Sequence, residues 1–166
     1  MTDWELNARV AALLAQEGHA LDTRDWDTWL ALYDENVRYW MPSWKNESEQ
    51  TSDPATGMAL FYFASRAGLE DRVWRLRSGK SVASVPLMRT SHAVSNVLAR
   101  EAEPGMVEAQ ASWTCHVFNP KRQQQNVFFG RYELRIRTDG DRWRIAGKKV
   151  SLLNDYIPTL LDFYCV

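Results

Sequence analysis

The chain has 166 residues, of which 25% are charged and 45% hydrophobic, with a formal net charge of -1 and a pI near 6.3. This balance is typical of a globular domain with a real core, and it gives no electrostatic argument for a nucleic-acid partner. No apolar run approaches membrane-spanning length, no signal segment precedes the first helix pattern, and the two cysteines lack a framework spacing. We therefore expect a single domain over residues 1–166 and a soluble cytoplasmic protein with reduced thiols.

Two helices are predicted near the N-terminus. Thr2 and Glu5 have the T-x-x-E spacing of a capping box, and apolar residues then recur at helical spacing as far as Leu21. Asp25 is placed to accept backbone N–H bonds at the start of a second, shorter helix. One apolar face of that helix is predicted to consist of Trp26, Trp29, Leu30 and Tyr33.

The short helix leads directly into a strand. Residues 37–41 are of β type, and Pro42 ends the strand because proline cannot donate a hydrogen bond to a ladder. Residues 43–54 are polar and lack periodicity, which predicts a surface loop. Residues 58–63 are apolar and short, so a strand and a helical turn both remain open. A third helix is predicted through residues 68–77.

Long alternating segments fill the second half of the chain. Strands are predicted over residues 89–99, 106–118, 126–137 and 142–153, with turn signals at Pro104-Gly105 and Asp139-Gly140. Helices followed by an antiparallel meander predict an α+β fold. The order of long helix, short helix and strand is typical of a cystatin-like or NTF2-like cone, with N-terminal helices packed on a long twisted antiparallel sheet. The apolar C-terminus is expected to dock on another part of the structure.

The eight tryptophans are the unusual count in this composition. Tryptophan buries a large area and needs a partner for its N–H group, so this number suggests a broad interior or a sizeable subunit interface. Both interpretations stay open. We expect Trp40 to be a core residue, whose truncation to alanine would cost about 3–5 kcal/mol.

The spacing of potential metal ligands argues against an intrinsic metal centre. The three histidines, His19, His92 and His116, lie far apart in the sequence. A Rieske cluster needs two Cys and two His, and a mononuclear iron site needs two His and a carboxylate. Cys115 and His116 point to opposite faces of a strand and cannot share a metal without distortion. Nucleophile elbows and glycine-rich phosphate loops are also absent from the sequence, so we expect no metal-binding residue, no cofactor-binding residue and no catalytic nucleophile in this chain.

Acid–base chemistry is the remaining catalytic possibility. His92 lies on a predicted strand, and Asp34, Tyr33 and Tyr39 lie on the elements that would cover that sheet. A His–Asp or Tyr–Asp set in an apolar pocket could move protons. The alternative, which we favour, is that His92 only joins a hydrogen-bond network at the sheet face. The partners considered for such a network are Ser91, Ser95 and Arg89.

Five segments, in this order, resemble the small (β) subunit of aromatic-ring-hydroxylating dioxygenases of the benzoate, toluate and anthranilate type. They are LDTRDWDTWLALYDENVRYWMPSW, GLEDRVWRLRSGKS, RTSHAVSNV, FFGRYELRIR and KKVSLLNDYIPTLLDFY, and they span nearly the whole chain. The pair YWMPSW and RTSH is the most specific. Residues 45–57 and 102–110 depart from the family pattern, and such loops often meet a partner subunit.

The resemblance implies a cone that trimerises and lies under three large (α) subunits in an α3β3 oxygenase. In such oxygenases the Rieske cluster and the mononuclear iron belong to the large subunit, electrons come from NADH through a reductase, and both atoms of O2 add to the ring as a cis-dihydrodiol. The motif residues would then be structural. Those expected to support the fold are Trp26, Trp29, Trp40 and Pro42, and those expected in the polar network of the sheet are Arg89, His92 and Asn96.

Two functions are therefore compared. The first is a non-catalytic, assembly-forming subunit of a dioxygenase that acts on a benzoate-like acid. The second is a free-standing NTF2-like lyase or isomerase that uses His92 with Asp34 or a tyrosine, and a ligand-binding cone without chemistry is a weaker third. Bulky apolar residues on the inward strand positions, such as Trp113, Phe128 and Tyr132, favour a filled interior and hence the first function.

Overall fold

The computed structural model describes residues 1–79, 85–158 and 161–166. Lys80, Ser81, Thr159 and Leu160, which belong to two of the family segments, lie outside the described residues. The elements are α1 (Asp3–Thr23), α2 (Trp26–Ala31), β1 (Tyr33–Pro42), β2 (Ala59–Phe63), α3 (Arg66–Arg77), β3 (Arg89–Glu103), β4 (Met106–Asn119), β5 (Gln124–Asp139), β6 (Arg142–Leu152) and a short 3-10 helix η2 (Phe163–Cys165).

The strands form one six-stranded sheet in the order β2-β1-β6-β5-β4-β3. The predicted meander from β3 to β6 is confirmed, and residues 59–63 form a strand. The expectation of a wholly antiparallel sheet is wrong at one place, because β1 and β6 are parallel, with Trp40 opposite Lys149. A tight hairpin forces antiparallel pairing, but β1 and β6 are joined through most of the chain, so either direction was open to them.

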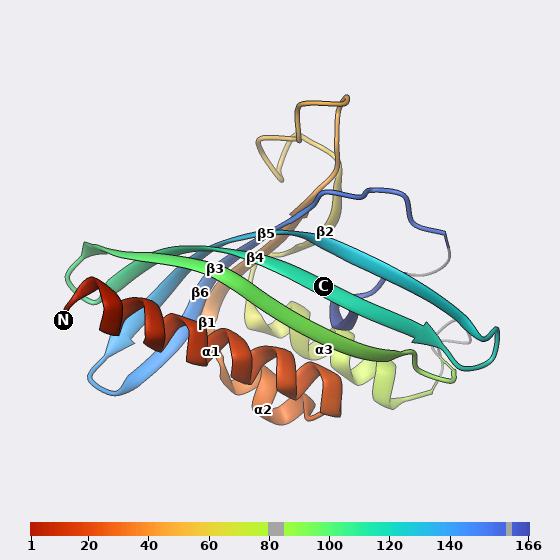
Figure 1. The fold of residues 1–166 in the computed structure, drawn as a ribbon, viewed down its shortest axis with the longest axis horizontal. Helices are drawn as coiled ribbons and strands as arrows, with labels where there is room; N and C mark the ends of the chain where they lie inside the picture. The colour runs from red at the N-terminus through yellow and green to blue at the C-terminus, as the bar shows by residue number, and fades with distance from the viewer. Residues whose placement is uncertain (80–84, 159–160) are drawn as a thin grey trace.

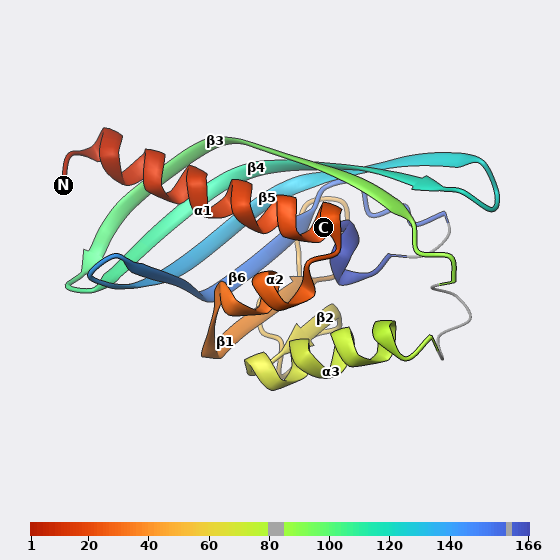
Figure 2. The same cartoon turned by 90° about the horizontal axis from the view of Figure 1, so that it is seen from below.

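The helices lie on one face of this twisted sheet. Figure 1 shows α1 and α2 beneath the strands, with the loop of residues 43–58 projecting from the other side. Figure 2, seen from below, shows α1 crossing the long strands, while α3 lies beside β1 and β2. Helices packed against one face of a long twisted sheet confirm the predicted α+β class. The opposite face of the sheet carries no helix among the described residues, and this asymmetry defines the surface considered below.

The predicted helix caps are present. The Glu5 N–H donates to Thr2 Oγ1 at 3.3 Å and the Thr2 N–H donates to Glu5 Oε2 at 2.9 Å, which completes the capping box. The Asp25 carboxylate accepts the Thr28 N–H at 3.2 Å. Tyr33, which was expected on the second helix, is instead the first residue of β1. The chain pairs with β6 directly after the helix ends, because the Ile145 N–H donates a hydrogen bond to Leu32 O at 2.8 Å.

The core fills the space between the helices and the sheet. Trp29 is fully buried and stacks on Phe163, with ring centroids 4.7 Å apart, and Trp113 stacks on Tyr132 at 5.4 Å. The last four residues of the chain are buried, so the apolar C-terminus docks on the core as expected. Cys115 is a buried free thiol, as its inward strand position predicted.

Trp40 does not lie in this core. The alternation of β1 directs Tyr39 and Met41 inward and leaves Trp40 half-buried on the helix-free face, where the Lys149 ammonium lies 5.6 Å from its ring centroid. The prediction that Trp40 is a core tryptophan is therefore wrong. Trp29, which is fully buried, is the tryptophan whose truncation to alanine should carry the cost that was predicted for Trp40.

Candidate assembly surface and interior polar clusters

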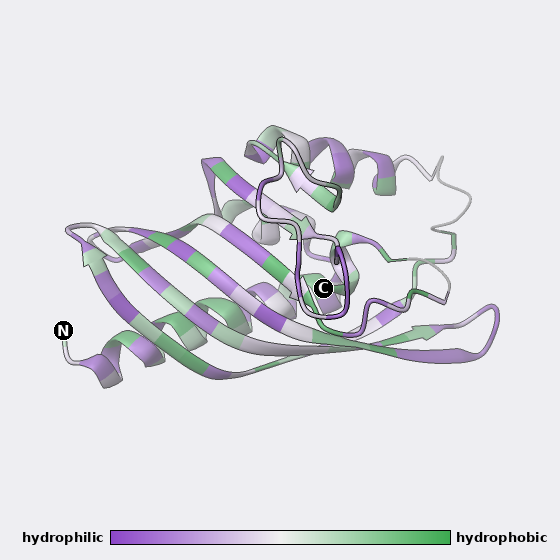
Figure 3. Ribbon diagram, turned by 90° about the horizontal axis from the view of Figure 1, so that it is seen from above, coloured by the Kyte–Doolittle hydropathy of each residue, from purple (hydrophilic) through white to green (hydrophobic). Residues whose placement is uncertain are grey.

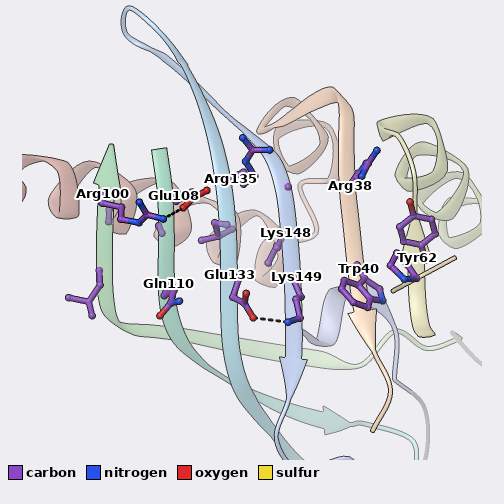
Figure 4. A pocket seen from close by; sticks show the side chains of 16 residues that line it. Arg38, Trp40, Tyr62, Arg100, Glu108, Gln110, Glu133, Arg135, Lys148 and Lys149 are labelled. Carbon is purple, nitrogen blue, oxygen red and sulfur yellow. Dashed lines mark hydrogen bonds and ion pairs between the residues drawn. The ribbon is translucent and has the colours of Figure 1, made fainter. Parts of the chain in front are cut away.

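Figure 3 views the sheet from its helix-free face, with α1 behind the strands. The strand order places two rows of outward positions across this face. The pairing register aligns the first row as Tyr62, Trp40, Lys149, Glu133, Gln110 and Leu98, and the second row as Arg38, Gly147, Arg135, Glu108 and Arg100. Figure 4 shows side chains of both rows around one groove. The groove has a volume of about 710 Å³, and Pro54 from the projecting loop lines it as well.

Charged side chains on this face are partly paired with one another. Lys149 binds Glu133 at 2.8 Å, Arg100 binds Glu108, and Arg135 binds Glu103 at 3.2 Å. Two further arginines, Arg38 and Arg131, are exposed and have no ion-pair partner among the residues that the structure describes. Because Leu98 is also 68% exposed, the face mixes arginine, aromatic and aliphatic groups in the manner of protein interfaces.

The loop that rises beside this face, residues 43–58, is held by its own hydrogen bonds. At its base the indole N–H of Trp44 donates to Leu152 O at 2.7 Å, and the hydroxyl of Thr51 donates to Met58 O at 2.9 Å. At its first turn the side-chain oxygen of Asn46 accepts the N–H groups of Ser48 and Glu49 at 3.0 and 2.9 Å. A surface loop was predicted here, and the structure gives it a fixed shape.

His92 is paired with Asp22, a residue that the sequence interpretation had not selected. One Asp22 oxygen lies 2.6 Å from His92 Nδ1, and the carboxylate also accepts the His92 N–H at 2.9 Å and the Thr90 hydroxyl at 2.8 Å. Burial acts to raise the pKa of Asp22, but the hydrogen bonds from His92 outweigh it, and the pKa lies below its usual value. Asp22 is therefore ionised at neutral pH, and the His92 Nδ1–H donates to it.

His92 is almost fully buried and lines a pocket of about 270 Å³ between α1 and β3, together with Gly18, His19 and Asp22. The side chain is 3% exposed, and Nε2 is buried without a hydrogen-bond partner among the described residues. Gly18 of α1 packs so closely that a Cβ there would lie 3.1 Å from His92 Cβ. The expected partners Ser91, Ser95 and Arg89 are replaced by Asp22, because alternation directs the two serines to the other face and Arg89 lies over the Phe118 ring.

Asp34 is not part of a catalytic pair with His92. Its carboxylate accepts the Asn36 N–H at 3.0 Å and binds the Arg137 guanidinium at 3.0 Å, and these contacts lower its pKa. The His92–Asp34 site required by one version of the lyase or isomerase hypothesis is therefore absent, because each residue is held by a different partner. In the tyrosine version Tyr33 is not available either, because its hydroxyl donates to Glu17. Asn96, another motif residue, has a positive φ of 53° where the β3–β4 register shifts, and its side chain donates to Ser112 Oγ at 3.3 Å.

A second interior cluster was missed from the sequence. The Lys148 ammonium donates to Glu17 Oε1 at 2.7 Å, and the Tyr33 hydroxyl donates to the same carboxylate oxygen. The ammonium also lies 4.0 Å from the ring centroid of Tyr132 and 5.7 Å from that of Tyr39. Burial lowers the pKa of Lys148 against the opposing effect of Glu17, and burial raises the pKa of Tyr33, Tyr39 and Tyr132.

The side chains of this cluster pair with one another and connect α1 to β1 and β6. The Tyr33 hydroxyl and the Lys148 ammonium both donate to the Glu17 carboxylate, so the role of the cluster is to hold together elements that are distant in the sequence. A signal for it was present: Glu17 falls at helical spacing between Leu14 and Leu21, on the apolar face of α1. Lys148 likewise alternates with Val150 and Leu152 on the inward side of β6.

Within residues 1–79, 85–158 and 161–166 no group of three His, Cys, Asp or Glu side chains could hold a metal ion. The donor sets of a Rieske cluster and of a mononuclear iron site are thus not assembled by the described residues. None of the helices in that part of the chain is both long enough and apolar enough to cross a membrane.

Comparisons with known proteins identify the family. Residues 16–159 match the family model described as the ring hydroxylating beta subunit. The anthranilate 1,2-dioxygenase small subunit of Acinetobacter baylyi is 38% identical over 162 residues, which are 98% of either chain. The crystal structure of the benzoate 1,2-dioxygenase beta subunit from Burkholderia mallei has a TM-score of 0.79 at 34% identity and covers 96% of both chains.

A structure named as a scytalone dehydratase from Novosphingobium aromaticivorans shares the fold alone, with a TM-score of 0.69, 13% identity and coverage of 98% of this chain and 97% of that one. The fold is thus the expected NTF2-like cone. The family match covers more than half of the chain, and the sequence relative covers nearly all of it. The chain therefore belongs to the ring hydroxylating beta subunit family.

Proposed function

We propose that this chain, as one domain over residues 1–166, is the non-catalytic small subunit of a Rieske non-haem iron oxygenase that cis-dihydroxylates a benzoate-like aromatic carboxylate. The family match carries this proposal, and relatives named for anthranilate and benzoate dioxygenases support an aromatic acid as the substrate. The role of the chain is to assemble and stabilise the oxygenase. No residue of the chain is assigned to catalysis, to a cofactor or to a metal.

The cofactors belong to the partner in this proposal. The large subunit holds the Rieske [2Fe–2S] cluster and the mononuclear iron, and NADH supplies electrons through a separate reductase. Two observations support this division. Burial raises the pKa of Cys115, which favours the neutral thiol over the thiolate that a cluster requires. His92 is paired with the Asp22 carboxylate, 2.6 Å from its Nδ1, and packs closely on Gly18.

The chain associates with itself and with the large subunit as α3β3. The helix-free face of the sheet supports this assembly, because it exposes Arg131 and carries a groove of about 710 Å³ lined by Arg38 and Leu98. Exposed arginine and aromatic groups around a hollow are frequent in interfaces between subunits.

Reconstitution tests this function. The large subunit is expressed with and without this chain, and each preparation receives the reductase, NADH and either benzoate or anthranilate. We expect a cis-dihydrodiol only from the preparation that contains both subunits, with iron bound to the large one. A large subunit that is fully assembled and active without this chain would contradict the proposed role.

A further inference from the structure

We propose that the loop of residues 43–58 of one copy docks on the helix-free face of the next copy, where Glu47 meets the exposed arginines Arg38 and Arg131. The inference rests on the self-association contained in the proposed function, and it goes further by naming the two surfaces that meet. It depends on three observations: the shape and charge of the loop, the unpaired cations of the face, and the direction in which the loop projects.

The loop is acidic and already in one conformation. Residues 43–58 contain three carboxylates and one lysine. Glu49 is paired with Lys45 at 3.3 Å, whereas Glu47 is exposed and has no ion-pair partner among the described residues. The Asn46 side chain holds the turn that displays Glu47, by accepting the N–H groups of Ser48 and Glu49. A loop held in this way loses little conformational entropy when it binds.

The second turn of the loop is also fixed. The Asp53 carboxylate accepts the Ala55 N–H at 2.9 Å and the Thr56 hydroxyl at 3.0 Å. Gly57 donates its N–H to Asp53 O at 2.8 Å, and a Cβ at this position would lie 2.9 Å from that same oxygen, so glycine permits the closure. Asp53 is thus committed to the internal structure of the loop, which leaves Glu47 as the carboxylate available to a partner.

The face presents the complementary charge. Cations outnumber carboxylates on this face: Arg38, Arg100, Arg131, Arg135 and Lys149 against Glu103, Glu108 and Glu133. Arg38 lies opposite Gly147 in the register, and Arg131 lies between Ser112 and Ser151. Gly147 and Ser112 are small, which gives an incoming carboxylate access to either guanidinium for a bidentate pair. Ser151, on the other side of Arg131, is covered by Gln50 of the chain's own loop, whose Oε1 accepts its hydroxyl at 3.0 Å.

The direction of the loop allows contact with the face of a neighbouring copy. The loop projects from the side of the sheet opposite the helices (Figure 1). A loop–face contact can be repeated around a ring or made twice in a two-fold pair, and the ring is the arrangement that the proposed trimer requires. A pairing that set the two arginine-rich faces against each other without the loops would bring like charges together, which is unfavourable.

A charge-swap experiment on the co-expressed oxygenase tests the contact. The variants are Glu47→Arg, Arg38→Glu, Arg131→Glu and each double variant that combines Glu47→Arg with one arginine reversal. The control is Asp71→Arg, which reverses an exposed carboxylate on α3. The dissociation concentration of the self-associated small subunits is measured by sedimentation and light scattering, together with the mass of the whole complex.

We expect Glu47→Arg and at least one of the arginine reversals to raise that concentration about tenfold or more, and the corresponding double variant to recover most of the loss. Asp71→Arg should leave it unchanged. If wild-type small subunits never associate with one another, the proposed trimer itself is wrong. If they do associate but the reversals have no effect, or no double variant recovers, then the loop does not meet this face and only the present inference is overturned.

Discussion

Glu17 and Lys148 form an ion pair of 2.7 Å in the interior, with side chains that are 3% and 1% exposed. The pair joins the first helix to the last strand, which are more than a hundred residues apart in the chain. Removing two charges from water is costly, and here a shared phenol hydroxyl and an aromatic ring beneath the ammonium offset part of that cost. The arrangement leads to two predictions.

Breaking the pair from one side should be more harmful than removing both charges. Glu17→Gln leaves the Lys148 ammonium buried without its counter-ion, and we expect a loss of about 3–5 kcal/mol in the free energy of unfolding. Lys148→Met should cost a similar amount, and the double variant clearly less than the sum of the two. Urea unfolding of all four proteins measures this coupling, and strictly additive losses would show that the two side chains act independently.

Alkaline pH should destabilise the fold through its buried phenols. Burial raises the pKa of Tyr33, Tyr39 and Tyr132 well above the usual 10.0. The unfolded chain releases these protons near pH 10 while the folded chain keeps them, so stability is intact below pH 10 and falls as the pH rises further. Urea midpoints between pH 8 and pH 11 should show this decline, with a shallower slope in Tyr39→Phe. Titration of all six tyrosines near pH 10 in the folded protein would contradict it.

A matched pair of glycines tests the packing of the two sheet faces. A Cβ on Gly130 would lie 1.7 Å from the Ser151 carbonyl oxygen, so Gly130→Ala must push strand β5 from β6 and should cost about 3 kcal/mol or more. Gly147→Ala on the neighbouring strand places its Cβ 3.5 Å from Arg135 Cβ, an ordinary contact, and should change little. Thermal melts compare the two variants, and equal melting temperatures would refute the packing described for Gly130.

Alternation and helical spacing predicted most of this fold, because each reports which side of an element is buried. They could not reveal the direction of β1 relative to β6, since no local turn connects those strands. They also misplaced Trp40. Its size suggested the core, whereas its position between the inward Tyr39 and Met41 required the opposite face.

The interior polar contacts were harder to predict for a different reason. The partner of His92 depends on how α1 packs on β3, and this packing places Asp22, not Asp34, beside the ring. Glu17 and Lys148 were present on inward positions, but charged residues are normally assigned to solvent unless a partner is known. In the sequence, a buried ion pair is visible only as two charged residues of opposite sign that both fall on inward positions.

His92 should matter for stability and assembly but not for chemistry. His92→Ala removes the Nδ1–H that the Asp22 carboxylate accepts, and we expect a loss of about 1–3 kcal/mol in stability or a lower yield of assembled complex. Turnover per assembled complex should stay close to that of the wild type. Ser91→Ala, on the other face of the same strand, serves as the control. A normally assembled complex with a loss of roughly a thousandfold in turnover would assign His92 a catalytic role.

The most direct test of the assembly role is size-exclusion chromatography with light scattering and iron analysis, on this chain alone and on the chain co-expressed with its large subunit. We predict an iron-free small subunit that joins the large one in an iron-containing α3β3 complex. A lone monomer or dimer that ignores the large subunit, or iron that purifies with this chain alone, would contradict the account.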